Sequence, residues 1–79
     1  MSKEDIFNVI VRHAREVLPN LRAHSFKQSD SLRSLGANSI DRADIIMLTL
    51  ESIGVNVPLA VMAGAENIGE LAGIIQQKR

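Results

Sequence analysis

A chain of 79 residues is one domain, 1–79, and is too small for an enzyme with a deep cleft, because small domains bury a smaller share of their surface. Nine basic and nine acidic side chains cancel, so no concentrated basic surface is available for nucleic acid. Hydrophobic residues make up 46% of the chain, with two phenylalanines as its aromatics and no cysteine, which predicts an aliphatic core without disulfides or thiolate metal sites.

The start of the chain, from Met1 to Asp5, is charged and leads into an amphipathic stretch, unlike the continuous apolar core of a secretory signal. The longest apolar runs fall far short of the roughly 20 residues that cross a bilayer. We therefore expect a cytoplasmic protein with no membrane partner, and we expect it to be a monomer.

A first helix is predicted from Ser2 and Asp5, which have the spacing of a capping box with aspartate in place of glutamate, and it ends at Pro19. Apolar residues recur along it at helical spacing: Ile6, Phe7, Ile10, Val11, Ala14, Val17 and Leu18. From 20 to 36 the chain is polar and irregular, which predicts a long loop held to the core by scattered apolar anchors. These anchors are Leu21, Phe26, Leu32 and Leu35.

A second helix is predicted to begin after the cap Asn38, with Asp41 reaching back, and to run to about residue 53 before Gly54 stops it. On a helical wheel one side suits a core and carries Ala43, Ile45, Ile46, Thr49, Leu50 and Ile53. The opposite side carries Ile40, Asp41, Asp44, Met47, Leu48 and Glu51. Three large apolar side chains among three carboxylates predict a docking surface for a partner. The alternative is that Met47 and Leu48 pack against the long loop.

Two further helices follow Pro58. Residues 59–64 allow one short helix, and Asn67 with Glu70 offers another capping box for a last helix. That last helix carries Ile68, Leu71, Ile74 and Ile75. No strand pattern competes with these segments, so the sequence predicts an all-α fold of three long helices and one short one.

Ser39 lies one residue inside the predicted cap, where free backbone N–H groups and the helix dipole favour an attached phosphate. Serine is also common near helix starts as a simple cap. Catalysis is disfavoured, because no Gly-x-Ser-x-Gly pattern occurs and neither His13 nor His24 has a visible orienting partner. We therefore expect both histidines to be solvent-facing or structural, and we expect no metal site.

The segment DSLRSLGANSID, from Asp30 to Asp41, resembles the acyl carrier protein family, whose pattern is an acidic residue, leucines, Leu-Gly, one variable residue, Asp, Ser, and Leu or Ile. The resemblance continues through Pro58 to the last helix. It implies an up-and-down four-helix bundle with a short third helix and a long loop between helices one and two. It also implies 4'-phosphopantetheine, transferred from coenzyme A by a phosphopantetheinyl transferase to the serine that by position is Ser39.

Three features depart from the family pattern. Asn38 replaces the usual aspartate, the chain is neutral where many carriers are acidic, and Arg42 adds a positive charge to the second helix. Asparagine still caps a helix, so the expected fold is unchanged. The departures bear on partner choice, because electrostatic steering depends on charge.

Two segments resemble the stand-alone donor carriers of polyketide β-branching cassettes: GANSIDRADIIMLTLESIGVNVP and AGAENIGEL. That resemblance implies a malonyl group loaded by a malonyl acyltransferase and decarboxylated to acetyl by a ketosynthase-like enzyme. A synthase similar to hydroxymethylglutaryl-coenzyme A synthase then adds the acetyl to a β-keto intermediate on an acceptor carrier. Acceptor carriers commonly have a tryptophan shortly after the serine, and this chain has none.

Two alternatives stay open, and both share the bundle. A general fatty-acid, polyketide or nonribosomal-peptide carrier would use Ser39 with other partners, and a helical interaction domain would carry no modification. Ser31, in the tripeptide Asp30-Ser31-Leu32, is a rival for attachment. Its distance from Gly36 is too short for a long helix, so we expect Ser39 to carry the group. We expect the protein itself to be non-catalytic, because a thiol arm only carries thioesters between active sites and the bundle supplies no base or oxyanion hole.

Overall fold

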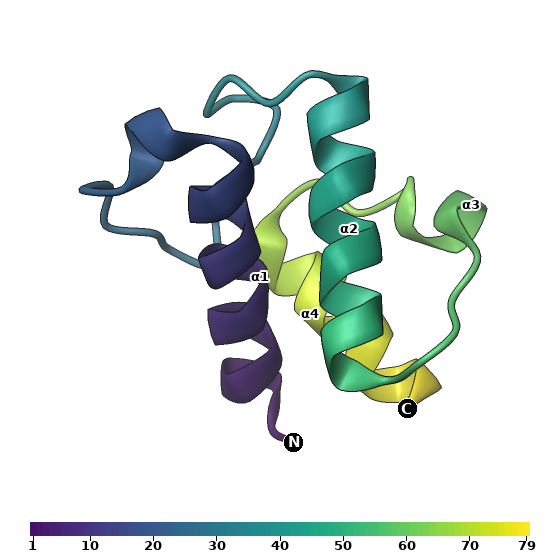
Figure 1. Ribbon diagram of the computed structural model, residues 1–79. Helices are drawn as coiled ribbons and strands as arrows, with labels where there is room; N and C mark the ends of the chain where they lie inside the picture. The colour runs from purple at the N-terminus through teal and green to yellow at the C-terminus, as the bar shows by residue number, and fades with distance from the viewer.

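The computed structural model describes residues 1–79 and is all-helical, as predicted. Its elements are α1 (Lys3–Val17), the 3-10 turn η1 (Pro19–Leu21), α2 (Ser39–Ile53), α3 (Leu59–Met62) and α4 (Ile68–Lys78). Figure 1 shows α1 and α2 side by side, α4 crossing behind them, and the short α3 beside the upper part of α2. No helix is long and apolar enough to span a membrane.

The start of α1 has the predicted capping box. The Asp5 backbone N–H donates to Ser2 Oγ at 3.1 Å, and the Ser2 backbone N–H donates to the Asp5 carboxylate at 3.0 Å. That backbone hydrogen bond to Ser2 lowers the pKa of the Asp5 carboxyl group. At the other end Pro19 opens η1, a turn that the sequence did not predict.

The ends of α2 also follow the prediction. Asn38 Oδ1 accepts from the Asp41 backbone N–H at 2.8 Å, and the Asp41 carboxylate accepts from the Asn38 N–H at 3.2 Å. Gly54 ends the helix with φ 78°, a left-handed conformation that glycine adopts without a Cβ penalty. Both the capping box and the glycine stop are therefore confirmed, and they fix where Ser39 begins the helix.

The start of α4 is only half of the predicted capping box. Asn67 Oδ1 accepts from the Glu70 backbone N–H at 2.8 Å. The Glu70 carboxylate, however, accepts from the backbone N–H of Glu66 at 3.5 Å rather than from Asn67. The prediction of a reciprocal box was wrong at this helix, because the carboxylate reaches one residue further back along the chain.

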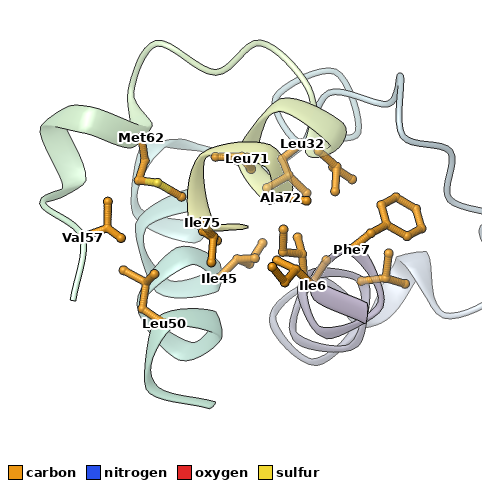
Figure 2. Close-up of a cluster of buried hydrophobic side chains, with 14 of the residues drawn as sticks. Ile6, Phe7, Leu32, Ile45, Leu50, Val57, Met62, Leu71, Ala72 and Ile75 are labelled. Carbon is orange, nitrogen blue, oxygen red and sulfur yellow. The ribbon is translucent and has the colours of Figure 1, made fainter. Parts of the chain in front are cut away.

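The core lies where α1, α2 and α4 meet, and Figure 2 shows its side chains converging from all three helices. Its largest fully buried side chains are Ile6, Ile10, Ile45, Met62, Ile68, Ile75 and Thr49. Two of the predicted loop anchors, Leu21 and Leu32, are buried, and Phe26 packs at the core edge. Leu35 is half-buried outside this cluster, and Ala37, which the sequence did not single out, is buried instead. The loop thus enters the core just before Ser39.

The long loop is also tied to the start of α4 by backbone hydrogen bonds. The Ile68 N–H donates to the carbonyl of Asp30 at 2.9 Å, and the Gly69 N–H donates to the carbonyl of Gln28 at 2.8 Å. A Cβ atom at Gly69 would lie 3.1 Å from both the Cβ and the carbonyl oxygen of Gln28. Glycine at this position therefore permits the close approach of loop and helix.

We expect Gly69→Ala to lower the free energy of unfolding by about 1–3 kcal/mol, because overpacking against Gln28 outweighs the helix propensity that alanine adds. Gly73→Ala is the matched control, since a Cβ there would lie 3.8 Å from Lys3 Cε, an ordinary contact. That control should gain up to about 1 kcal/mol. Chemical denaturation measures both variants, and equal stabilisation of the two would contradict the close approach.

His13 is buried and joins α1 to the end of α2. Its Nδ1 lies 2.6 Å from the Glu16 carboxylate, and its Nε2 lies 2.8 Å from Ser52 Oγ. The expectation that His13 is solvent-facing or structural is confirmed in its structural form, and the partner that the sequence did not show is Ser52, which the fold brings to it from 39 positions along the chain. Ser52 and Glu16 are solvent-exposed, and the hydrogen bond between His13 and Ser52 links α1 to α2.

We expect His13→Ala to lower the free energy of unfolding by about 1–3 kcal/mol, because it removes a buried side chain that is hydrogen-bonded at both ring nitrogens. Ser52→Ala should cost less, since the serine is exposed and water replaces its bond. Thermal and chemical unfolding measure the pair. A His13→Ala protein as stable as the parent would contradict a stabilising role for the link between α1 and α2.

His24 also has partners that the sequence did not reveal. Its Nε2 lies 3.0 Å from the Asp30 carboxylate, and its ring packs edge-on against Phe26 with centroids 4.8 Å apart. The Lys27 backbone N–H donates to the same carboxylate at 2.8 Å and, with the His24 contact, lowers the pKa of Asp30. The structural reading of His24 is confirmed here too, since its contacts with Asp30 and Phe26 order the loop.

Candidate functional site

Ser39 is the first residue of α2 and is exposed. The N-terminal end of α2 is its upper end in Figure 1. The side-chain oxygen of the cap residue Asn38 accepts from the backbone N–H of Asp41. The N–H groups of Ser39 and Ile40 have no hydrogen-bond acceptor in the protein. Free N–H groups at a helix N-terminus stabilise a negative charge. The surroundings of the Ser39 hydroxyl therefore fit a phosphate ester.

Ser31 has different surroundings. It precedes a non-helical turn over 32–36, is half-buried, and its Oγ accepts from the Ser34 backbone N–H at 3.3 Å. Gly36 closes that turn with φ 103°. No helix begins at Ser31, as the short distance to Gly36 predicted, so this hydroxyl lacks the helix N-terminus that Ser39 has.

A cleft of about 640 Å³ opens beside Ser39, between α2, α3 and the segment that leads into α4. Its lining from α2 comprises Ser39, Arg42, Ala43 and Ile46, and its lining from α3 includes Leu59 and Met62. Hydrophobic residues make up 8 of its 15 lining residues, so it is of mixed polarity. A flexible group attached to Ser39 would start at the wall of this cleft.

Arg42 is half-buried on the wall of that cleft. Its Nη1 donates to the carbonyl of Ala37 at 2.8 Å, which holds the guanidinium over the first turn of α2. Arg33 lines the cleft from the loop and is exposed, and Ser31 lies close by on the same wall. The cleft beside Ser39 thus contains two cationic side chains, of which only Arg42 is anchored by a hydrogen bond.

The predicted docking surface lies on the outer side of α2. Ile40, Met47 and Leu48 are 71%, 53% and 37% exposed, which are large fractions for apolar side chains. This exposure argues against the alternative in which Met47 and Leu48 pack against the long loop. Asp44 and Glu51 are exposed beside them. Asp41, the remaining residue predicted for this surface, is half-buried and belongs to the helix cap.

The exposed apolar surface continues onto α3, where the sequence predicted no docking residue. Leu59 and Val61 are 43% and 41% exposed, and a shallow groove between α2 and α3 is lined by Met47, Glu51 and Leu59. The signal was present in the run Leu-Ala-Val-Met, because a four-residue helix buries only one side, here Met62. Periodicity over so short a run does not decide which side faces inward.

Comparisons with known proteins agree with this geometry. A family model described as the phosphopantetheine attachment site matches residues 8–75. The polyketide biosynthesis acyl-carrier-protein AcpK of Bacillus subtilis (strain 168) is 44% identical over 78 residues, which cover 99% of this chain and 95% of that protein. A chain from the crystal structure of the curacin biosynthetic pathway HMG synthase in complex with acetyl donor-ACP is 42% identical and superposes with a TM-score of 0.94. That match covers 99% of this chain and 100% of the other.

Proposed function

Since this chain belongs to the phosphopantetheine-attachment family of acyl carrier proteins, we propose that it is the acetyl donor carrier of a polyketide β-branching system, with Ser39 as its attachment residue. The observation that carries the proposal is the exposed Ser39 hydroxyl, placed at a helix N-terminus with two unpartnered N–H groups and a cleft beside it. The span 1–79 then forms one carrier domain.

When bound, 4'-phosphopantetheine supplies a thiol that holds acyl groups as thioesters. The protein's own contribution is to hold the phosphate end and to present the rest. Ser39 Oγ would provide the ester oxygen. The free N–H groups of Ser39 and Ile40, at the positive end of the α2 dipole, would stabilise the negative charge of the phosphate. Because Ser39 is exposed, the active site of a phosphopantetheinyl transferase has access to its hydroxyl.

The donor role draws on the structural comparison. The matching crystal structure is described as an HMG synthase in complex with acetyl donor-ACP, and AcpK is described as a polyketide biosynthesis carrier. Likeness over nearly the whole chain at 42% and 44% identity supports the same class of partner here. The partners we propose are a malonyl acyltransferase, a ketosynthase-like decarboxylase and a hydroxymethylglutaryl-coenzyme A synthase-like enzyme. The protein would meet them in the cytoplasm, as a monomer.

The docking surface of α2 is our proposed contact with these enzymes. Exposed apolar side chains lose water at the centre of an interface, and methionine adapts to several partner shapes in turn. Ile40, Met47 and Leu48 supply this apolar centre, while Asp44 and Glu51 at its rim orient the approach. A carrier that visits several enzymes needs such a mixed surface rather than one tight pocket.

Coexpression with a phosphopantetheinyl transferase, followed by intact-protein mass spectrometry, tests the carrier role. We expect one added prosthetic group per chain, whereas an unmodified helical interaction domain would keep its apo mass. The general-carrier alternative needs a second assay with an elongating fatty-acid ketosynthase. Efficient elongation of acyl groups on this carrier would favour that alternative over the donor role.

A further inference from the structure

Arg42 lies one helical turn from Ser39 on the same side of α2, because residues three apart are neighbours on a helix surface. Both residues line the cleft between α2 and α3. Helical side chains lean toward the N-terminus, and the hydrogen bond from Arg42 Nη1 to the Ala37 carbonyl at 2.8 Å holds the guanidinium beside the first turn. The cation is thus held close to the point of attachment.

This cation has no counter-charge within the protein. The ion pairs of the structure are those of His13 with Glu16 and of His24 with Asp30, and neither involves an arginine. Asp41, its neighbour in sequence, is engaged with the Asn38 backbone in the helix cap. Glu66 also lines the cleft but forms no ion pair with Arg42.

We propose that Arg42 is a positioning residue that binds the phosphodiester of the prosthetic group and directs the attached arm along the cleft. A guanidinium carries five N–H donors in a planar fork that matches phosphate oxygens, and the Ala37 carbonyl occupies one of them. Together with the free N–H groups of Ser39 and Ile40, it completes an anion site of one side chain and two backbone donors. The inference rests on the proposed attachment at Ser39.

Nuclear magnetic resonance of the holo protein tests the contact without any partner enzyme. Intact mass first establishes that each variant carries the group. The ³¹P resonance of the phosphodiester and the side-chain ¹⁵N resonance of Arg42 are then recorded at low and high salt. In the parent protein we expect the Arg42 resonance to shift between the apo and holo forms, and the ³¹P resonance to move with salt.

Three variants make the test specific. Arg42→Gln keeps an amide donor for the Ala37 carbonyl but loses the charge, so the salt-dependent ³¹P shift should disappear. Arg42→Lys should restore it in part, because a lysine keeps the charge without the fork. Arg33→Gln is the matched control, since Arg33 lines the same cleft but is exposed and unanchored, and it should leave the ³¹P shift in place.

An unchanged ³¹P resonance in modified Arg42→Gln would overturn this inference while leaving the carrier role intact. An Arg42 shift that appears on malonyl loading and not in the holo form would also overturn it, because the bound anion would then be the malonyl carboxylate. A protein that gains no mass with the transferase would instead refute the proposed function itself, and the inference with it.

Discussion

Ser39→Ala is expected to abolish attachment of the prosthetic group, while Ser31→Ala accepts it at the rate of the parent protein. The oxygen that forms the phosphoester is lost in the first variant, and no other hydroxyl in the loop stands at the start of a long helix. Intact mass spectrometry after incubation with coenzyme A and a phosphopantetheinyl transferase measures both. Ser39 is exposed, so the variant should remain folded.

The physical contrast between the two serines makes this result informative. Both line the cleft beside α2, so position near the cleft does not separate them. They differ in that Ser39 has free backbone N–H groups next to its hydroxyl, whereas Ser31 Oγ already accepts from the Ser34 N–H in a turn. A Ser31→Ala protein that stays unmodified, with Ser39→Ala modified, would show that the attachment residue is misassigned.

Truncation of the docking surface is expected to weaken binding to the synthase without loss of stability. Met47→Ala and Leu48→Ala should each cost about 1–2 kcal/mol of affinity, a factor of about 5–30 in the dissociation constant. Each side chain is exposed in the free protein, so its removal leaves no cavity in the core. Titration calorimetry gives the affinity, and thermal unfolding of the same samples gives the stability.

Leu50→Ala is the matched control for these variants, because Leu50 belongs to the same helix but is buried. It should lower the free energy of unfolding by about 2–5 kcal/mol, through lost burial and the cavity it leaves. Early unfolding of the Met47 and Leu48 variants, with normal affinity for the synthase once folded, would place those side chains in the core. It would also place the docking surface elsewhere.

Charge should act on this interface mainly through the rate of association. The chain is neutral overall, so raising the salt concentration should weaken binding to the synthase only modestly. Asp44→Lys should slow association more than it changes dissociation, because Asp44 is exposed at the rim of the proposed docking surface.

The elements that were predicted well are those fixed by local chemistry. The capping boxes at Ser2 and Asn38 and the glycine stop at Gly54 depend on residues within one turn of each other, so spacing in the sequence was sufficient. The exposed side of α2 followed from periodicity over a long helix for the same reason. Attachment at Ser39 stays a prediction, and it rests on the family resemblance as well as on the cap, since a serine near a helix start is common.

The features that were missed depend on parts of the chain that meet only in the fold. The contact of His13 with Ser52 spans 39 positions, and the approach of Gly69 to Gln28 joins a helix to a loop. The direction of the Arg42 side chain depends on where the Ala37 carbonyl lies, and a helical wheel contains no such information. The reach of Glu70 to Glu66 depended on a side-chain conformation that spacing does not determine.

Transfer of a labelled acetyl group from the holo protein to an HMG synthase-like enzyme tests the central claim most directly. The carrier is loaded with isotopically labelled acetyl, mixed with the synthase, and both proteins are weighed by intact mass spectrometry during a single turnover. We predict that the labelled acetyl group leaves the carrier and appears on the synthase, and that Ser39→Ala, which cannot be loaded, transfers none. Label that stays on the parent carrier in the presence of active synthase would contradict the donor role.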